Sequence, residues 1–324
     1  MSFSKPKVFL TRELPAPAIQ KLKEFTDLEM NPHDRTLTKA EIIKGIQGKD
    51  ALLCLLTNQI DAEIMDANPK LKVLSNFAVG FNNIDVVAAT ERKLMVTNTP
   101  GVLTDTSADM AFALILAVAR RVVEGDQFVR SGAWKGWGPM QFMGTDVYGS
   151  TLGILGLGRI GKGVVRRASG FDMKVLYWNR TRLSPKEEKE LGLSYCSKDD
   201  LLMQADFVSL NLAYNSETHH FISTEDFLKM KSSAFLINTA RGPIVDEKAL
   251  VMALQNKTIA GAGLDVFENE PMVEPALLDM KNVVLLPHLA SATQATRTKM
   301  AMMAVDNLLA VLNDEEPENW VNPF

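Results

Sequence analysis

The sequence is poor in cysteine and contains no long apolar run. Its two cysteines, Cys54 and Cys196, show no CxxC pair and no other spacing typical of metal ligands, so we expect thiols in a reducing compartment and no metal site. No apolar run approaches the roughly 20 residues that span a bilayer, which argues against a membrane partner. The N-terminal residues also lack the pattern of a secretory signal, and we expect a cytoplasmic protein.

A strong positive charge is also missing. The 35 lysines and arginines are outnumbered by 39 aspartates and glutamates, and the formal net charge is -4, spread along the chain without a basic stripe. Nucleic acid is therefore not an expected partner. What is present is the composition of an ordinary globular protein, with 46% hydrophobic residues in a chain of 324. That length is enough for about two domains.

Short apolar runs alternate with amphipathic segments, which is typical of parallel sheets covered by helices on both faces. In the first hundred residues the expected strands are 8–11, 28–30, 51–56, 73–77 and 95–99, and the expected helices are 16–25, 39–46 and 62–67. In a second series the expected strands are 152–155, 173–178, 206–212, 234–240, 258–266 and 282–287, and the expected helices begin near 159 or span 246–254 and 293–312. The sequence thus predicts an α/β protein with two doubly wound parallel sheets, a Rossmann nucleotide-binding domain and a flavodoxin-like domain.

One long helix is predicted from Met110 to about Val129, after several capping candidates at 104–109. Its first half is apolar on nearly every face, so it is expected to be buried in a domain core or against another subunit. The next segment is rich in glycine and aromatic residues and is predicted to be an ordered arm. Four of its side chains are expected either to form an interaction patch or to fold back on their own domain: Trp134, Trp137, Met140 and Phe142.

The stretch 151–161, TLGILGLGRIG, predicts a dinucleotide-binding turn between a strand and a helix. In this pattern Gly156 allows the tight turn, Gly158 lets the backbone approach a pyrophosphate, and Gly161 lets the helix pack close to the strand. The pyrophosphate would bind free N–H groups at the start of the helix. The expected cofactor contacts in this turn are Gly156, Leu157, Gly158, Arg159 and Ile160.

The residues after the next strand indicate which dinucleotide is bound. NAD-binding domains carry an acidic residue there, about 20 residues after the glycines, which holds the ribose 2′-hydroxyl. Here the sequence has no carboxylate but reads Asn179, Arg180, Thr181 and Arg182. Since arginine can bind a 2′-phosphate, this pattern favours NADP(H), with NAD(H) as the alternative if the arginines are only solvated surface residues.

Three polar residues follow strands of the second series, at the sheet edge where ligands of open α/β sheets bind. They are Arg241, Glu270 and His288. Reduction of a carbonyl needs a proton donor that works near neutral pH, and histidine is the side chain best suited to that task. The other histidines are expected in packed or surface positions: His33, His219 and His220.

The sequence resembles the D-isomer-specific 2-hydroxyacid dehydrogenase family, and within it most closely glyoxylate/hydroxypyruvate reductases and 2-ketogluconate reductases. The resemblance covers essentially the whole chain and rests on ordered motifs. These are NFAVGFNNID (76–85), VLTDTSADMAFALIL (102–116), GILGLGRIG (153–161), LINTARGPIVDE (236–247), GAGLDVFENEP (261–271) and LLPHLASAT (285–293).

The resemblance implies a catalytic role for each of the three strand-end residues. Arg241 would bind the substrate carboxylate and carbonyl, His288 would act as the acid/base group, and Glu270 would pair with His288. This agrees with their chemistry, because a planar guanidinium fits a 2-oxo carboxylate and an adjacent glutamate favours the charged imidazolium. The expected reaction is hydride transfer from NAD(P)H to C2 of a small 2-keto acid, glyoxylate or hydroxypyruvate, while His288 protonates the oxygen.

The resemblance also implies further contacts and an assembly. Val79 and Gly80 would bind the substrate carboxylate through backbone amides, and Trp137 of a neighbouring subunit would line the substrate pocket of a homodimer. Additional cofactor contacts are expected at Thr104, Thr239, Ala240 and Asp265. The expected domains are a discontinuous substrate-binding domain, 1–99 with 289–324, and a dinucleotide-binding domain, 100–288, whose dimerisation helix and arm cover about 105–148.

Other functions remain open at this point. The chain could be a 2-ketogluconate reductase, another D-2-hydroxyacid dehydrogenase or a non-enzymatic dinucleotide-sensing regulator. Formate dehydrogenases resemble this family but have glutamine where Glu270 stands, and phosphoglycerate dehydrogenases commonly add a regulatory domain for which this length leaves no room.

Overall fold

The structure, a computed structural model, describes residues 4–324, and its internal contacts divide the chain into two units. The first unit comprises Met1–Leu103 together with Ala292–Phe324, and the second comprises Thr104–Ser291. Residues 1–3, which open the expected first domain, lie outside the described residues. Each unit contains one parallel sheet with helices on both faces, so the predicted fold class is confirmed.

The first unit has five parallel strands: β1 Lys7–Leu10, β2 Asp27–Met30, β3 Ala51–Leu55, β4 Val73–Phe77 and β5 Met95–Thr97. Their order in the sheet is β2-β1-β3-β4-β5, which is the flavodoxin-like order. All five residues of β4 are buried, as expected for a central strand that is covered on both faces.

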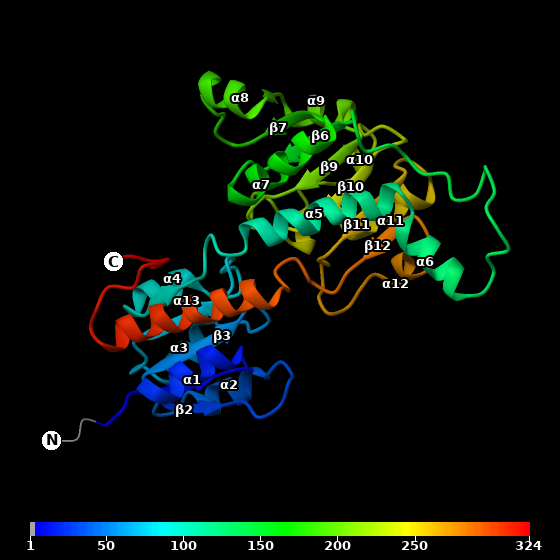
Figure 1. Cartoon of the computed structure of the whole chain (residues 1–324). Coiled ribbons are helices and arrows are strands. Elements are labelled where there is room, and N and C mark those ends of the chain that lie inside the picture. Colours follow the sequence, from blue (N-terminus) through cyan, green and yellow to red (C-terminus); the bar gives the residue numbers. More distant parts are fainter. Residues whose placement is uncertain (1–3) are drawn as a thin grey trace. The chain divides into compact units, whose positions relative to one another are not determined.

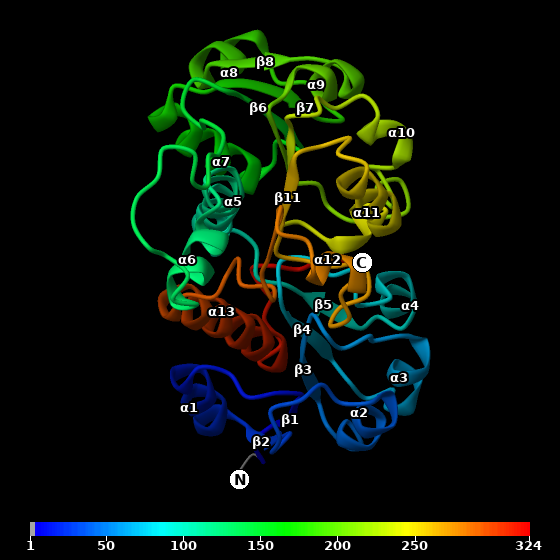
Figure 2. The same ribbon diagram turned by 90° about the vertical axis from the view of Figure 1, so that its right-hand side faces the viewer.

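Helices cover both faces of this sheet: α1 Ala16–Phe25, α2 Lys39–Gly45, α3 Ala62–Ala67, α4 Val86–Glu91 and α13 Gln294–Leu312. Apolar residues of α1 and α13 pack on one face, and those of α2, α3 and α4 pack on the other (Figure 2). Helix α13 is bonded to β4, because the Ser75 hydroxyl donates to the carbonyl oxygen of Ala304 at 2.8 Å. The chain therefore contributes to this unit from both of its ends.

The second unit has seven parallel strands: β6 Thr151–Leu155, β7 Lys174–Trp178, β8 Leu193–Tyr195, β9 Phe207–Leu210, β10 Phe235–Asn238, β11 Gly261–Leu264 and β12 Val283–Leu285. The sheet order is β12-β11-β10-β9-β6-β7-β8. This is the Rossmann order extended by one strand, with β6 at the point where the direction of winding reverses. Ligands of such sheets bind beyond the carboxyl ends of the strands at this switch point.

Its helices are α5 Thr104–Ala119, α6 Val122–Arg130, α7 Arg159–Ala168, α8 Pro185–Leu191, α9 Lys198–Gln204, α10 Thr224–Phe227, α11 Glu247–Gln255 and α12 Pro275–Leu278. Apolar residues of α5 and α7 pack on one face of the sheet, and those of α9, α10 and α11 pack on the other (Figure 1). Short 3₁₀ turns lie at Ser169–Phe171 and Gly242–Ile244.

The predicted single helix from Met110 to Val129 is wrong, because the structure has two helices, α5 and α6. The first begins at Thr104, so the expected capping residues lie inside it. The second follows after Arg121, whose backbone is left-handed with φ +55°. The carbonyl oxygen of Ala119, at the end of α5, accepts a hydrogen bond at 2.9 Å from the N–H of Thr145 and is not used to extend the helix. The arm then follows α6 as a long loop (Figure 1).

Candidate active site

The turn between β6 and α7 has the geometry that the glycine pattern predicts. Gly156 has φ +93°, and a Cβ there would lie 2.8 Å from the backbone carbonyl of Asn211. A Cβ on Gly161 would lie 2.3 Å from the carbonyl oxygen of Gly156, so α7 packs directly against the turn. No atom lies within 4 Å of the corresponding position on Gly158. A ligand therefore has room to approach the backbone at the start of α7, where Arg159 and Ile160 belong to the first helical turn.

The carboxyl end of β7 lies beside this turn. The side-chain oxygen of Asn179 accepts a hydrogen bond from the N–H of Leu157 at 3.2 Å, and its amide donates to the carbonyl oxygen of Thr181 at 2.9 Å. Asn179 therefore connects the glycine turn to the segment that was expected to select the dinucleotide.

The two arginines of that segment have different environments. Arg182 forms a two-bond ion pair with Glu188, at 2.7 and 2.9 Å, and its guanidinium lies 5.1 Å from the ring centroid of Tyr195. The side chain of Arg180 is 84% exposed, and its ion pair with Glu217 is long, at 3.7 Å. Arg180 is thus the arginine that is available to a ligand, whereas Arg182 is bound within the protein.

His288 and Glu270 form a pair after the last two strands of the sheet. Nδ1 of His288 lies 3.0 Å from Oε2 of Glu270, and the other carboxylate oxygen accepts the N–H of Phe267 at 3.1 Å. Desolvation alone would raise the pKa of Glu270. The hydrogen bond and charge of His288, the N–H of Phe267 and the charge of Arg241 outweigh it, and the pKa lies below its ordinary value. Glu270 is therefore an anion near neutral pH and can stabilise a charged imidazole.

Asp265 holds the backbone around this histidine. It is fully buried, and its two carboxylate oxygens accept the N–H groups of Leu289 at 2.6 Å and Ala290 at 2.8 Å. Its carbonyl oxygen accepts the N–H of His288 at 2.9 Å. Burial raises the pKa of Asp265 against the opposing effect of the two N–H groups and of His288. His288 has a left-handed backbone with φ +55°, a conformation that non-glycine residues adopt only where their surroundings enforce it.

Arg241 follows β10 and is half-buried. Its Nη1 donates to the carbonyl oxygen of Ala240 at 2.7 Å, and the side chain of Asn238 bonds both the N–H of Ala240 and the carbonyl oxygen of Arg241. Burial lowers the pKa of the guanidinium, and the charge of Glu270 partly offsets this effect. The group remains a cation at any working pH, because arginine is not deprotonated in proteins. Arg241 and His288 therefore both act electrostatically on Glu270 beyond the carboxyl ends of neighbouring strands.

Val79 and Gly80 form a turn at the carboxyl end of β4 in the first unit. The amide of Asn98 donates to the carbonyl oxygen of Val79 at 2.7 Å, and that of Asn76 donates to the carbonyl oxygen of Gly80 at 3.0 Å. Within residues 4–324 the N–H groups of Val79 and Gly80 donate to no protein acceptor. The turn therefore presents two free N–H groups that can bind an anion.

Three comparisons relate the chain to known proteins. The family model "D-isomer specific 2-hydroxyacid dehydrogenase, NAD binding domain" matches residues 112–290. The chain is 51% identical over 320 residues to a glyoxylate reductase of Korarchaeum cryptofilum, covering 98% of this chain and 96% of the relative. It also matches the structure of an NADPH-dependent glyoxylate/hydroxypyruvate reductase of Sinorhizobium meliloti in complex with NADP and malonate, with a TM-score of 0.89, 34% identity and coverage of 98% and 97%. A structure from Thermus thermophilus gives a TM-score of 0.91 at 45% identity, with coverage of 97% and 99%.

The chain belongs to the D-isomer specific 2-hydroxyacid dehydrogenase family. As a dehydrogenase with an NAD-binding domain, it is an oxidoreductase that uses a nicotinamide dinucleotide. The matched region contains β6 to β12 and therefore the glycine turn, Arg241, Glu270 and His288.

The structure of the second unit by itself supports the binding of a dinucleotide. Two buried oxygens at the carboxyl ends of β9 and β10, Oδ1 of Asn211 and Oγ1 of Thr239, have no hydrogen-bond partner among the described residues. Unpaired buried polar atoms are costly unless a ligand or water satisfies them. Thr104, at the start of α5, lies beside α7, since its carbonyl oxygen is 3.7 Å from the place of a Cβ on Gly163. The neighbouring strand ends thus offer polar atoms where the glycine turn leaves space.

Trp137 lies on the arm of the dehydrogenase, and its surface is 84% exposed. Arg121 and Phe142 anchor the base of the arm, with the guanidinium 5.0 Å from the ring centroid. Other large apolar side chains of α6 and the arm are also exposed: Val122, Val123, Val129, Trp134, Met140, Met143 and Tyr148. The fold therefore presents a continuous stretch of chain with many exposed apolar side chains.

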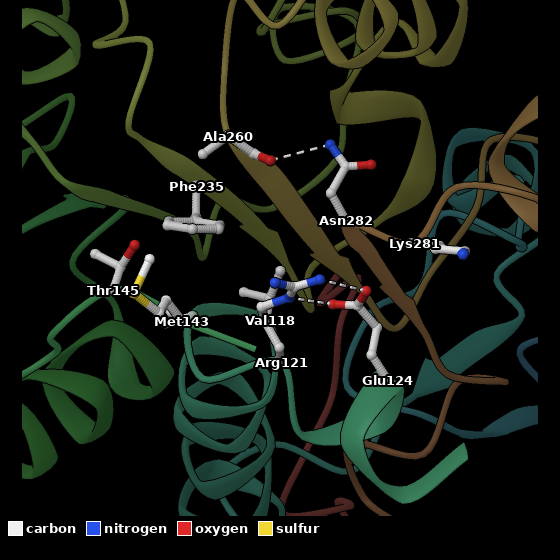
Figure 3. Close-up of a pocket in the computed structure, with 11 residues that line it drawn as sticks. Val118, Arg121, Glu124, Met143, Thr145, Phe235, Ala260, Lys281 and Asn282 are labelled. Atoms are coloured by element: carbon white, nitrogen blue, oxygen red, sulfur yellow. Dashed lines mark hydrogen bonds and ion pairs between the residues drawn. The ribbon is translucent and has the colours of Figure 1, made fainter. Parts of the chain in front are cut away.

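A hollow of about 300 Å³ lies at the amino ends of strands of the second unit, opposite the carboxyl ends that carry the expected site residues (Figure 3). It is lined by residues that precede or begin strands, such as Phe235, Ala260 and Asn282, by Arg121 between α5 and α6, and by Met143 of the arm. It contains none of the expected site residues. The described residues contain no group of three metal-ligating side chains, and no helix among them is long and apolar enough to cross a bilayer.

Two polar residues near the site were not singled out in the sequence. Asn211 lies at the end of a predicted strand in the same way as the three selected residues, so its position alone could have identified it. His220, expected in a packed or surface position, forms a 2.9 Å contact between Nε2 and Oε1 of Glu268. No sequence signal links these two residues, which are 48 positions apart.

Proposed function

We propose that this protein reduces a small 2-keto acid, glyoxylate or hydroxypyruvate, to the D-2-hydroxy acid, using a reduced nicotinamide dinucleotide. The observation that carries the proposal is the pairing of His288 with Glu270 at 3.0 Å, next to the cationic Arg241, at the carboxyl ends of neighbouring strands. The relatives that are named glyoxylate reductases support the same substrate class.

Arg241 binds the substrate. Its planar guanidinium matches the carboxylate and adjacent keto oxygen of a 2-keto acid, and its charge stabilises the negative charge that develops on that oxygen. Partial burial strengthens this interaction, because fewer water molecules compete for the cation. The free N–H groups of Val79 and Gly80 bind the substrate carboxylate.

His288 supplies the proton. A reduced nicotinamide, when bound, would supply the hydride for C2 of the keto acid. The keto oxygen takes the proton of the His288 imidazolium, so the substrate gains one hydride and one proton and the imidazole becomes neutral. Glu270 stabilises the imidazolium before the transfer and fixes the orientation of the ring through Nδ1, which leaves Nε2 to face the substrate.

The dinucleotide is held by the glycine turn and the strand ends of the second unit. Gly156, Gly158 and the first N–H groups of α7 would hold the pyrophosphate, and Thr239, Ala240 and Asp265 would hold the nicotinamide half of the cofactor. We propose a preference for NADP(H), with the exposed Arg180 and the nearby Asn179 and Thr181 at the 2′-phosphate. The bound state of Arg182 makes Arg180 the main cationic contact.

The arm mediates homodimerisation in this proposal. Its exposed apolar side chains are those that a second copy would cover, and Trp137 would then reach the substrate pocket of the partner subunit. We also propose a cytoplasmic location. Both cysteines are free thiols, and burial raises the pKa of Cys54 to about 12, so it is protonated and unreactive in a reducing compartment.

A substrate panel tests the function directly. Glyoxylate, hydroxypyruvate, 2-ketogluconate and pyruvate are each assayed with NADPH and with NADH, following oxidation of the dinucleotide. We expect the highest kcat/KM for glyoxylate or hydroxypyruvate with NADPH. Turnover of none of the four keto acids with either dinucleotide would disprove the proposal, and a preference for 2-ketogluconate would reassign the substrate within the family.

A further inference from the structure

The second unit contains a second histidine–glutamate pair, close in sequence to the first. Nε2 of His220 lies 2.9 Å from Oε1 of Glu268, and the two side chains are 35% and 23% exposed. Glu268 is two residues before Glu270, the partner of His288. One short loop after β11 thus carries two glutamates that face two different histidines.

Glu268 is fixed from a second direction by Glu247, the first residue of α11. The N–H of Glu268 donates to Oε1 of Glu247 at 2.7 Å, and the N–H of Glu247 donates to Oε2 of Glu268 at 3.3 Å. Glu247 is buried, and burial raises its pKa, as do the charges of Glu268, Glu274 and Glu270. Several carboxylates therefore lie at this loop, and His220 is the side chain that donates a hydrogen bond to Glu268.

The backbone of His220 joins this loop to the segment that carries Arg241. Its N–H donates to the carbonyl oxygen of Pro243 at 2.8 Å, and Ile222 continues the contact as a parallel bridge to Val245. His220 adopts a left-handed backbone, with φ +48°, at the start of this contact. His220 thus bonds through its main chain to the segment that follows Arg241, and through its side chain to the loop that carries Glu268 and Glu270, here called the glutamate loop.

The two segments that His220 joins are themselves in direct contact. A Cβ on Gly242, the residue after Arg241, would lie 1.9 Å from the carbonyl carbon of Phe267 and 2.4 Å from the nitrogen of Glu268. No side chain fits between these backbones. A small shift of the glutamate loop would therefore change the place of Glu270 relative to Arg241 and His288.

We propose that His220 is a positioning residue, which through Glu268 holds the loop that carries Glu270 in its bonding position to His288. His220 touches no reacting group and acts only through this loop. The inference rests on the proposed function, because it assigns His288 and Glu270 to proton transfer.

The test compares two substitutions that differ in reach. In His220→Gln the side-chain amide nitrogen takes nearly the place of Nε2 and can still donate to Glu268. In His220→Asn the side chain is too short for its amide to reach Glu268. His219→Asn is the matched control, because this ring stacks on His220 at 4.0 Å but has its polar contact with Tyr214. The full-length variants are assayed for kcat and KM with glyoxylate and NADPH, for the pH profile of kcat/KM and for NADPH affinity by fluorescence.

We expect His220→Asn to lower kcat by about 10- to 100-fold, since small misplacements of catalytic groups cost that much. The alkaline limb of its pH profile moves to lower pH, because Glu270 no longer stabilises the imidazolium, while NADPH affinity is unchanged. In His220→Gln and His219→Asn both kcat and the pH profile stay near those of the unaltered protein. An unchanged pH profile in His220→Asn, or equal losses in His220→Asn and His219→Asn, would overturn the proposal.

His288→Ala separates this outcome from failure of the proposed function. If His288→Ala is inactive while His220→Asn is normal, only the positioning role is lost. If His288→Ala keeps its activity, the proposed function itself is disproved.

Discussion

The two units share a doubly wound parallel arrangement but differ in the turn after their first strand. In the second unit this turn carries Gly156 and Gly158 and leaves open space at the start of α7. In the first unit the corresponding turn, 11–15, has no glycine. Its Thr11 is buried, its hydroxyl donates to Asn58 at 2.7 Å, and its carbonyl oxygen accepts the amide of Asn31 at 3.0 Å. The turn after the first strand is therefore closed by internal hydrogen bonds in the first unit and open to a ligand in the second.

Unpaired buried oxygens, in contrast, occur in both units. In the second unit Asn211 and Thr239 carry them, at the strand ends beside the glycine turn. In the first unit they belong to Thr97 and Thr99, next to the turn at Val79, because the N–H of Thr99 donates to the carbonyl oxygen of Ala78. Each unit thus leaves polar atoms unsatisfied where the proposal places a ligand, the dinucleotide in one and the substrate carboxylate in the other.

The largest expected effect tests whether the chemistry belongs to the second unit. His288→Ala removes the proton donor, and Arg241→Ala removes the charge that stabilises the developing oxyanion. Each should lower kcat/KM for glyoxylate by about 10²- to 10⁴-fold, while NADPH affinity, measured by fluorescence, is retained. Asn98→Ala, which frees the carbonyl oxygen of Val79 in the first unit, should mainly raise KM. A loss of NADPH affinity in His288→Ala would point to a misfolded second unit and contradict this division.

The next largest effect tests whether the turn after the first strand binds a ligand in the second unit but only stabilises the fold in the first. Gly161→Val in the second unit forces α7 away from the carbonyl oxygen of Gly156, and we expect NADPH to bind about 10- to 100-fold more weakly. Thr11→Val in the first unit removes the bond to Asn58 and should lower the free energy of unfolding by about 1–3 kcal/mol without changing NADPH affinity. Titration of NADPH and denaturant unfolding check the pair. Equal NADPH affinity in Gly161→Val and the unaltered protein would show that the turn does not hold the dinucleotide.

The sequence predicted eleven of the twelve strands in the described residues, because short apolar runs alternate with amphipathic segments. It missed the short edge strand β8, Leu193–Tyr195. Helix α4 was missed, since its sequence VVAATE is short and carries β-branched residues typical of strands. The break between α5 and α6 was missed because it depends on the left-handed Arg121 and on a hydrogen bond from Thr145, both set by tertiary contacts. The local sequence pattern therefore predicted the layers of strands and helices. The break between α5 and α6 depends on contacts between residues that are distant in sequence.

The proposed site residues at strand ends could be selected from the sequence for a related reason. In parallel sheets the residue after a strand lies at the ligand-binding edge, so Arg241 and His288 could be placed from the strand pattern alone. The partners of Arg182 and His220 could not be predicted in this way. Glu188 at Arg182 and Glu268 at His220 lie on segments whose packing no pattern encodes, so the sequence treated both arginines alike and gave His220 no role.

A smaller effect sharpens the contrast between the two arginines. Arg180→Ala should raise KM for NADPH about tenfold and leave KM for NADH unchanged, because a charge-assisted bond to the 2′-phosphate is lost. Arg182→Ala should raise both KM values similarly and lower Tm, because it removes the ion pair with Glu188. Steady-state kinetics with both dinucleotides and a thermal melt distinguish the two. An NADPH-specific effect of Arg182→Ala alone would mean that this ion pair opens when the cofactor binds.

The smallest expected effect concerns acid stability. In the second unit the bonds from Arg182 and from the hydroxyl of Tyr177 lower the pKa of Glu188 from 4.5 to about 2. A carboxyl whose pKa is lowered by folding stabilises the fold above its unfolded pKa, and this stabilisation is lost as pH falls through about 4.5 toward 2. Glu188→Gln should therefore lower stability at pH 6 but reduce the further loss on acidification, as followed by unfolding at fixed temperature across that range.

The matched variant in the first unit is Glu41→Gln. Arg35 lowers the pKa of Glu41 too, but both side chains are exposed, and water and salt weaken exposed ion pairs. Glu41→Gln should thus change the acid profile less than Glu188→Gln does, and added salt should remove its effect first. If the two variants shift the profile equally at low and at high salt, burial of Glu188 does not protect its pair, and Arg182 should be as available to a ligand as Arg180.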